Sequence, residues 1–123
     1  MKLRIKGNTI RFRLTQTEID TIASGAVEDK TQFPGGNSLT YKIQKGDSFN
    51  TEFLNGTVLI TVPSEVINEW AKSDKVSIDH SIELDNGGQL EISLEKDFKC
   101  LTERPKEDET DMYPNPLEKH SNC

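Results

Sequence analysis

Apolar and polar residues alternate with a period of two over the first fourteen residues, on both sides of Gly7-Asn8. Alternation on either side of a two-residue turn predicts a β-hairpin with one apolar and one polar face. The expected register sets Leu3 against Phe12 and Arg4 against Arg11. The predicted polar face carries five basic side chains and no acidic one: Lys2, Arg4, Lys6, Arg11 and Arg13.

The middle of the chain also has the pattern of strands. Asn55-Gly56 is a pair that type I′ turns favour, and it predicts a hairpin over residues 48–62. Residues 27–45 have strand character around a turn at residues 33–37, but the pattern fixes no register there.

A third hairpin is predicted over residues 76–98. Its turn is expected at Asn86-Gly87-Gly88, a three-residue loop with glycine in the left-handed position. The resulting register places two pairs of like charge opposite each other, Glu83 with Glu91 and Asp79 with Glu95.

Two short helices are predicted between the hairpins. Thr15 and Glu18 form a capping-box pattern that begins the first helix, and Gly25 is a natural stop. Ser64 is expected to cap the second helix, whose apolar side includes Trp70 as a core anchor.

These elements predict one α+β domain over residues 1–101. We expect a mostly antiparallel sheet built from hairpins, open or partly closed into a barrel, with two short helices on one apolar face. Residues 102–123 lose all periodicity and are rich in charge, which predicts an extended or partly disordered acidic tail. The sequence shows no internal repeat beyond this recurrence of hairpins.

Composition narrows the classes of partner. The chain has 123 residues, a length that fits one domain, and a net charge of −6, which argues against nucleic acid. It has no run of about 20 apolar residues for a membrane span, and charged residues interrupt any apolar leader at its start. We therefore expect a cytoplasmic protein, with no indication of its oligomeric state.

The charge is uneven along the chain. The net charge is +5 over residues 1–13, −8 over residues 14–101 and −3 over residues 102–123. Like charges opposite each other across a strand pair repel, so neither the basic nor the acidic hairpin is stable by its charges alone. The two hairpins either lie side by side as a solvated lattice, or face each other across a partly closed barrel, or bind ions of opposite sign.

The basic hairpin is the first candidate site. Arginine binds phosphate and carboxylate with two nitrogens at once, so a rigid group of arginines and lysines is suited to an anion. The lattice is the simpler interpretation, because exposed ion pairs are common on such faces and contribute only about 0–1 kcal/mol each. The acidic tail is a third candidate partner for this face.

Metal binding is considered at two places, although no cofactor is expected by default. Clustered carboxylates hold Mg²⁺ beside phosphates, which makes the acidic hairpin a candidate divalent site. Its residues are Asp79, Glu83, Glu91 and Glu95. The second candidate is a tail site formed by Cys100, His120 and Cys123, although the two cysteines are also expected as reduced thiols or as a disulfide.

An acidic hairpin facing a basic one resembles the layout of the triphosphate tunnel enzymes. That family opens with an E-x-E-x-K strand, whereas this chain has Lys2, Arg4 and Lys6 at those positions. The likeness implies at most a metal-dependent enzyme that acts on phosphate or triphosphate.

A second resemblance covers nearly the whole chain. The opening Met1–Leu14, the stretch Glu95–Phe98 with Cys100, and the closing Tyr113-Pro-Asn-Pro116 with Cys123 are similar to a family of small bacterial proteins of unknown function. This resemblance implies no reaction, substrate or catalytic residue.

The expected function is therefore that of a small, non-enzymatic binding module. Its contact surface is the basic hairpin, and its partner is a small anion or an acidic protein segment. The alternatives are the metal-dependent phosphate enzyme and the metal site in the tail.

Overall fold

Hairpins and helices alternate along the chain in a computed structural model that describes residues 1–98. The predicted tail lies outside these residues. The elements are β1 (Lys2–Lys6), β2 (Thr9–Leu14), α1 (Gln16–Ala23), β3 (Ala26–Gln32), the short 3₁₀ turn η1 (Pro34–Gly36), β4 (Ser38–Gly46), β5 (Asn50–Leu54), β6 (Thr57–Pro63), α2 (Ser64–Lys72), β7 (Ser77–Glu83) and β8 (Gln89–Lys96).

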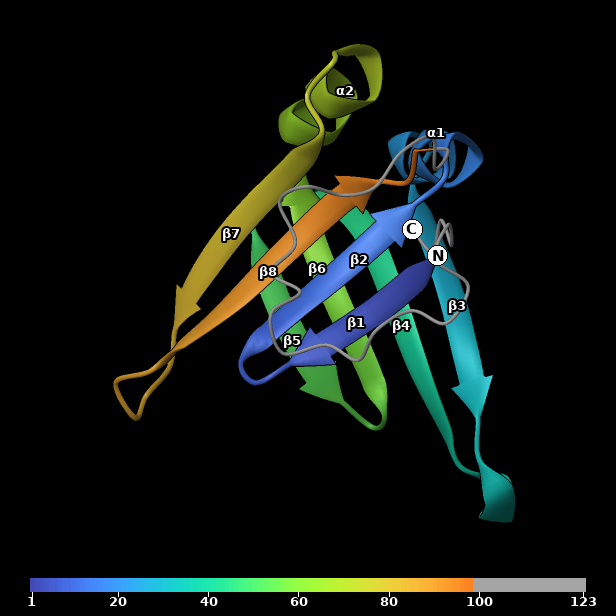
Figure 1. Cartoon of the computed structure of the whole chain (residues 1–123), viewed down its shortest axis with the longest axis vertical. Helices are drawn as coiled ribbons and strands as arrows, with labels where there is room; N and C mark the ends of the chain where they lie inside the picture. Colours follow the sequence, from blue (N-terminus) through green and yellow to red (C-terminus); the bar gives the residue numbers. More distant parts are fainter. Residues whose placement is uncertain (99–123) are drawn as a thin grey trace, which may run out of the picture.

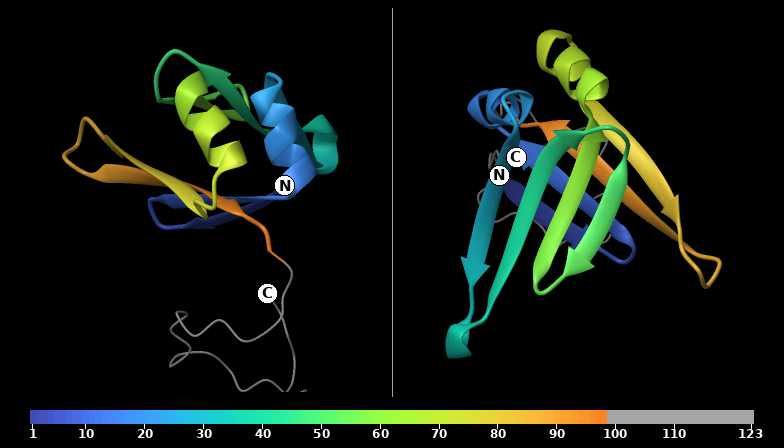
Figure 2. Two further views of the ribbon diagram at one scale, coloured as in Figure 1. Left: turned by 90° about the horizontal axis from the view of Figure 1, so that it is seen from above. Right: turned by 180° about the vertical axis from the view of Figure 1, so that it is seen from behind.

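The strands form two sheets that lie in separate layers (Figures 1 and 2). The front sheet of Figure 1 has the order β1-β2-β8-β7, and the back sheet has the order β3-β4-β6-β5. Each sheet has one parallel pair at its centre, and the outer pairs are antiparallel hairpins. The predicted α+β class is confirmed, but there are two sheets in place of one, and within residues 1–98 they do not close into a barrel.

The hydrophobic core lies between the two sheets and under the helices. Alternation sends every second strand residue inward, and the buried strand residues belong to this inward set. Phe12, Leu14 and Leu94 come from the front sheet, and Ile43 and Val62 from the back sheet. The helices contribute Ile19, Ile22, Ile67 and Trp70 to the same cluster.

The two helices lie side by side at one end of the sandwich (Figures 1 and 2). They have eight and nine residues, and isolated helices of that length are marginal in water, so packing must hold them. The predicted capping box of α1 is confirmed, with Thr15 as its N-cap. The predicted cap of α2 is wrong, because Pro63 is the N-cap and the Ser64 hydroxyl instead donates to the Gly46 carbonyl at 3.2 Å.

Both helices end against a lysine from a neighbouring strand. Lys45 Nζ on β4 donates to the Ala23 carbonyl at 2.6 Å, and Lys96 Nζ on β8 donates to the Ser73 carbonyl at 2.6 Å. Carbonyl groups at a helix C-terminus lack partners within the helix and carry partial negative charge. Each lysine therefore satisfies the end of one helix.

The three predicted hairpins differ in how well their register was predicted. The register of β1 and β2 is confirmed at every pair, and the hairpin predicted over residues 48–62 is formed by β5 and β6. Asn55 and Gly56 have φ of 52° and 75°, as a type I′ turn requires.

The last hairpin is shifted from its predicted register. The Leu84 N–H donates to the Gly88 carbonyl at 2.8 Å, so the three-residue loop is 85–87 and not 86–88. Gly87 still holds the left-handed position, with φ of 90°. The faces of the strands are unchanged, but the predicted like-charge pairs are wrong, because serines lie opposite Glu91 and Glu95.

The two halves of the chain repeat one arrangement. Hairpin β1–β2, helix α1 and hairpin β3–β4 correspond in order to β5–β6, α2 and β7–β8. The pairing repeats as well, because β2 runs parallel to β8 just as β6 runs parallel to β4. The buried Ile19 and Ile22 of α1 match Ile67 and Trp70 of α2 at the same spacing. This repeat was not recognised from the sequence.

Candidate functional site

The first hairpin forms the surface with the clearest charge. Phe12 and Leu14 are fully buried, so the residues that alternate with them on β2 project from the outer face of the front sheet. Pairing across the hairpin brings Arg4 opposite Arg11 and Lys2 opposite Arg13. We call the outer side chains of Lys2, Arg4, Lys6, Arg11 and Arg13 the basic surface.

Strand β8 supplies acidic partners to one part of this surface. It runs parallel to β2 and places Glu95 beside Arg13. The Glu95 carboxylate lies 3.4 Å from Arg11 Nε and 3.6 Å from Arg13 Nη2. One carboxylate, about one-fifth exposed (22%), therefore serves two arginines.

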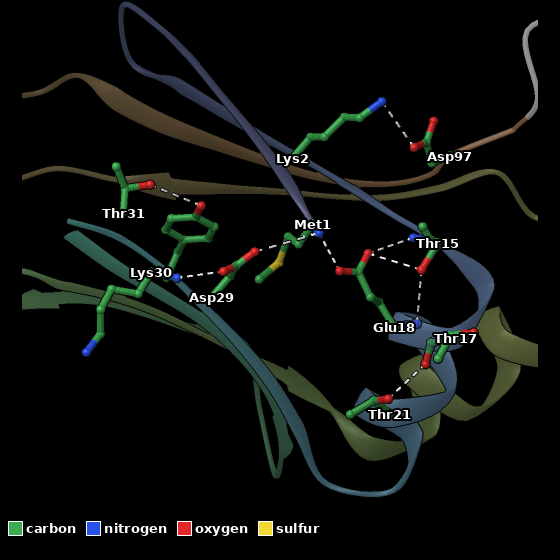
Figure 3. Close-up of polar contacts among 11 residues, drawn as sticks. Met1, Lys2, Thr15, Thr17, Glu18, Thr21, Asp29, Lys30, Thr31 and Asp97 are labelled. Atoms are coloured by element: carbon green, nitrogen blue, oxygen red, sulfur yellow. Dashed lines mark hydrogen bonds and ion pairs between the residues drawn. The ribbon is translucent and has the colours of Figure 1, made fainter. Parts of the chain in front are cut away.

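A second acidic residue meets the basic surface just after β8. Asp97 Oδ2 lies 3.4 Å from Lys2 Nζ (Figure 3). The Asp97 side chain is mostly buried, at 17% exposed, while the lysine side chain is 66% exposed. The side-by-side lattice is therefore the arrangement that the structure has for Lys2, Arg11 and Arg13.

The two remaining basic residues lie nearer the tip of the hairpin. Arg4 and Lys6 are exposed, and within residues 1–98 neither forms an ion pair. Arg4 also lies directly opposite Arg11, a like-charge arrangement that disfavours the hairpin. The Glu95 carboxylate pairs with Arg11 and not with Arg4. The basic surface is thus neutralised at its helix end and uncompensated at its tip.

The acidic hairpin lies on the same outer face and not across a cavity from the basic one. Glu91 and Glu95 alternate with the buried Ile92 and Leu94, and Ser93 separates them on β8. In the described part of the chain, no three His, Cys, Asp or Glu side chains come together as a group that could hold a metal ion. The second candidate metal site, at Cys100, His120 and Cys123, lies outside the described residues.

A small apolar hollow lies between β5 and β7, and its side chains do not suit it to polar chemistry. The ring of Phe49 stacks on that of His80, with centroids 4.2 Å apart and planes 11° from parallel. The remaining side chains around it are Thr51 and buried aliphatic residues: Ile60, Val62, Ile78, Ile92 and Leu94. His80 is the one ionisable group among these lining residues, so the hollow lacks a convergent polar set.

The amino group of Met1 is held by two carboxylates (Figure 3). Glu18 on α1 forms an ion pair and hydrogen bond with it, and Asp29 Oδ2 on β3 lies 4.0 Å away. Partial burial of Glu18 raises its pKa, but hydrogen bonds from this ammonium and from Thr15, together with the ammonium's charge, lower it more. The pKa of Glu18 is therefore below its ordinary value of 4.5. These contacts anchor β1 to the helix and the back sheet.

Sequence reasoning favoured the acidic hairpin, which contains Glu95, as the neighbour of the five basic residues, but it did not predict which residues meet. It assigned Glu95 to an acidic hairpin and gave no role to Asp97, because nothing in the alternation shows that β8 lies beside β2. Charge complementarity between the two hairpins was the available signal, and it supports side-by-side placement without fixing which residues meet.

Fold and surface together define a small α+β protein of two packed sheets with a partly neutralised basic surface. The chain belongs to a family of unknown function, DUF7009, whose match covers residues 1–117. This confirms the resemblance to an uncharacterised family and gives no support to a likeness with triphosphate tunnel enzymes. No curated protein and no solved structure matches the chain. Neither described helix is long and apolar enough to cross a membrane.

Proposed function

We propose that this protein is a binding module whose basic surface receives an extended acidic segment of a partner protein. The observation that carries the proposal is the uncompensated tip of the surface. Arg4 and Lys6 are exposed there without an ion-pair partner among residues 1–98, and Arg4 lies opposite a second arginine.

The shape of the surface favours an extended segment over a small anion. The five basic side chains lie on the outer face of a two-stranded hairpin at the edge of a sheet, and they are spread along both strands. Small-ligand sites are usually concave and bury most of their ligand. A row of cations along two strands suits a chain of carboxylates, whose side chains contact the row one after another.

Arg4 and Lys6 also alternate along β1, which is an edge strand of the front sheet. An edge strand has backbone N–H and C=O groups free for pairing, and an extended peptide binds such an edge by adding a strand. Lysines on an edge also protect it from unwanted pairing. An acidic segment fits this edge, because its charge removes the repulsion that keeps other strands away.

The test titrates a hexaglutamate peptide into the protein at low salt and follows the backbone amide signals by NMR. We expect the signals of β1 and β2 to shift. The double variant R4Q/K6Q should weaken binding by about threefold to tenfold, since each exposed charge pair is worth up to about 1 kcal/mol. The matched control is K30Q/K75Q, which removes two exposed lysines elsewhere and should leave the affinity within about twofold.

Three results would overturn the proposal. Equal weakening by both double variants would show that net charge alone attracts the peptide. Shifts confined to the back sheet would place binding elsewhere. Tighter binding of pyrophosphate than of hexaglutamate, lost in R4Q/K6Q, would make this a small-anion site.

A further inference from the structure

The last described residues of the chain lead onto the basic surface. Asp97 extends the pairing of β8 with β2, since its backbone N–H donates to the Leu14 carbonyl at 2.8 Å. Its carboxylate then pairs with Lys2 on the outer face of the front sheet (Figure 3). The chain thus passes residue 97 next to the basic surface, with an acidic side chain already on it.

The sequence beyond this point carries the complementary charge. Residues 107–111 read Glu-Asp-Glu-Thr-Asp, which is four acidic residues in five with no basic one. Residues 1–13 contain five basic residues and no acidic one. The described acidic partners on β8 and at Asp97 leave the cations at the hairpin tip unpaired. Residues 1–13 and residues 107–111 therefore carry opposite charges.

We infer that residues 107–111 dock at the tip of the basic surface, on Arg4 and Lys6, and compete there with the partner's acidic segment. This inference rests on the function proposed above and adds a regulator to it. Residues 107–111 occupy the same cations as the partner's acidic segment, so the partner must displace them in order to bind.

The tether is long enough for this contact. Glu107 is nine residues beyond Phe98, and an extended chain covers up to about 30 Å over that length. Strand β1 spans only about 13 Å from Lys2 to Lys6. A tethered segment acts at an effective concentration on the order of millimolar, so a contact too weak to hold a free peptide is well populated within one chain.

The test places a nitroxide spin label on the segment in the full-length protein, at T110C with C100S and C123S. NMR then measures how far the label broadens each backbone amide signal. We expect the signals of β1 and β2 to be broadened more than those of β3 and β4 at about 20 mM NaCl. The difference should fall at least about twofold at about 500 mM NaCl, because salt screens exposed charges.

The matched control carries the same label with E107Q, D108N, E109Q and D111N, and we expect it to lose the selective broadening. Hexaglutamate should bind this neutralised chain about twofold or more tightly than the chain with its acidic segment, because no internal segment competes. Equal affinity for both chains, or broadening confined to the back sheet or the helices, would overturn the inference and leave the proposed function intact. Selective broadening of β1 and β2 without hexaglutamate binding to the neutralised chain would instead overturn the proposed function alone.

Discussion

Glu95 is the residue on which the charge balance of the front sheet depends most. Its carboxylate forms ion pairs with Arg11 and Arg13, and Ser93 Oγ lies 3.4 Å from it. The variant E95Q keeps the size of the side chain and removes the charge. It leaves Arg4, Arg11 and Arg13 on adjacent positions of one hairpin without this carboxylate, so we expect the protein to be destabilised.

The expected magnitude follows from the exposure of each partner. Exposed ion pairs contribute about 0.2–1 kcal/mol, and the value rises as the pair is removed from water. Arg11 is 49% exposed, so its pair with Glu95 is discounted to the low end of that range. Arg13 is 16% exposed and Glu95 is 22% exposed, so their pair lies toward the upper end. Together they give a loss of about 1 kcal/mol, which lowers the Tm of a domain this size by about 4–8 °C.

The assay is thermal unfolding followed by circular dichroism, at low salt and at about 1 M NaCl. The Debye length falls to about 3 Å at the higher salt, so the difference between E95Q and the parent protein should shrink by at least about half. E91Q is the matched control, because Glu91 lies on the same strand and face, is exposed, and forms no ion pair within residues 1–98.

Two outcomes would refute this reasoning. If E95Q and E91Q lower the Tm equally, the arginine pairs contribute nothing specific. If the loss in E95Q persists unchanged at high salt, its cause is packing and not charge. A cycle with R13Q then gives the coupling energy of the more buried pair, which should exceed that of the R11Q cycle.

Three further predictions concern the folded state. G46A should destabilise the protein by about 1–3 kcal/mol in chemical unfolding, because an added Cβ would lie 2.6 Å from Thr61 Cγ2, and T61S should restore much of the loss. K45M and K96M should each lower the free energy of unfolding by about 0.5–1.5 kcal/mol in the same measurement, since each removes the hydrogen-bond donor at a helix end. Destabilisation by only one of the two variants would contradict the equivalent role of the two lysines in the repeated arrangement. The pKa of Glu18 in the folded state lies below its ordinary value of 4.5, so its contribution to stability is present above pH 4.5 and is lost as the pH falls through the folded pKa. The difference in unfolding free energy between E18Q and the parent protein should therefore shrink between about pH 5 and pH 3. A difference that stays constant would show that this titration is not linked to folding.

Local patterns determine much of this fold, and they were readable from the sequence. The alternation around Gly7-Asn8, the capping box of Thr15 and Glu18, and the Asn55-Gly56 turn each involve contacts a few residues apart. Turn preferences and helix capping act between such near neighbours, and they are strong enough to fix the register of a hairpin or the start of a helix. The basic surface was predictable for the same reason, because all of its residues belong to one hairpin.

The contacts between hairpins were not predictable in this way. A period-two strand states which face is buried but not which strand lies beside it, so the parallel pairing of β2 with β8 had no local signal. The shift of the last hairpin has a similar origin. Asp85 fits a loop as well as Gly88 does, and moving the loop by one residue keeps every side chain on its face while changing each partner.

The repeated halves also escaped detection because they share a pattern of apolar positions and not a run of identical residues. Trp70 takes the place of Ile22, and Val58 that of Ile10. The two residues of each pair are both hydrophobic but differ in shape, so the two halves share few identical residues. Their strand pairing, in contrast, is the same.

Each half of the chain contributes one hairpin to each sheet, and this has a consequence for folding during synthesis. Each sheet contains one hairpin from each half of the chain, and Thr9 pairs with Glu91 across most of the described sequence. Neither half has a complete sheet of its own to fold into. During synthesis the front sheet therefore stays incomplete until β8 has left the ribosome. Contacts of such high sequence separation slow folding, because a long loop must close before the contact stabilises anything.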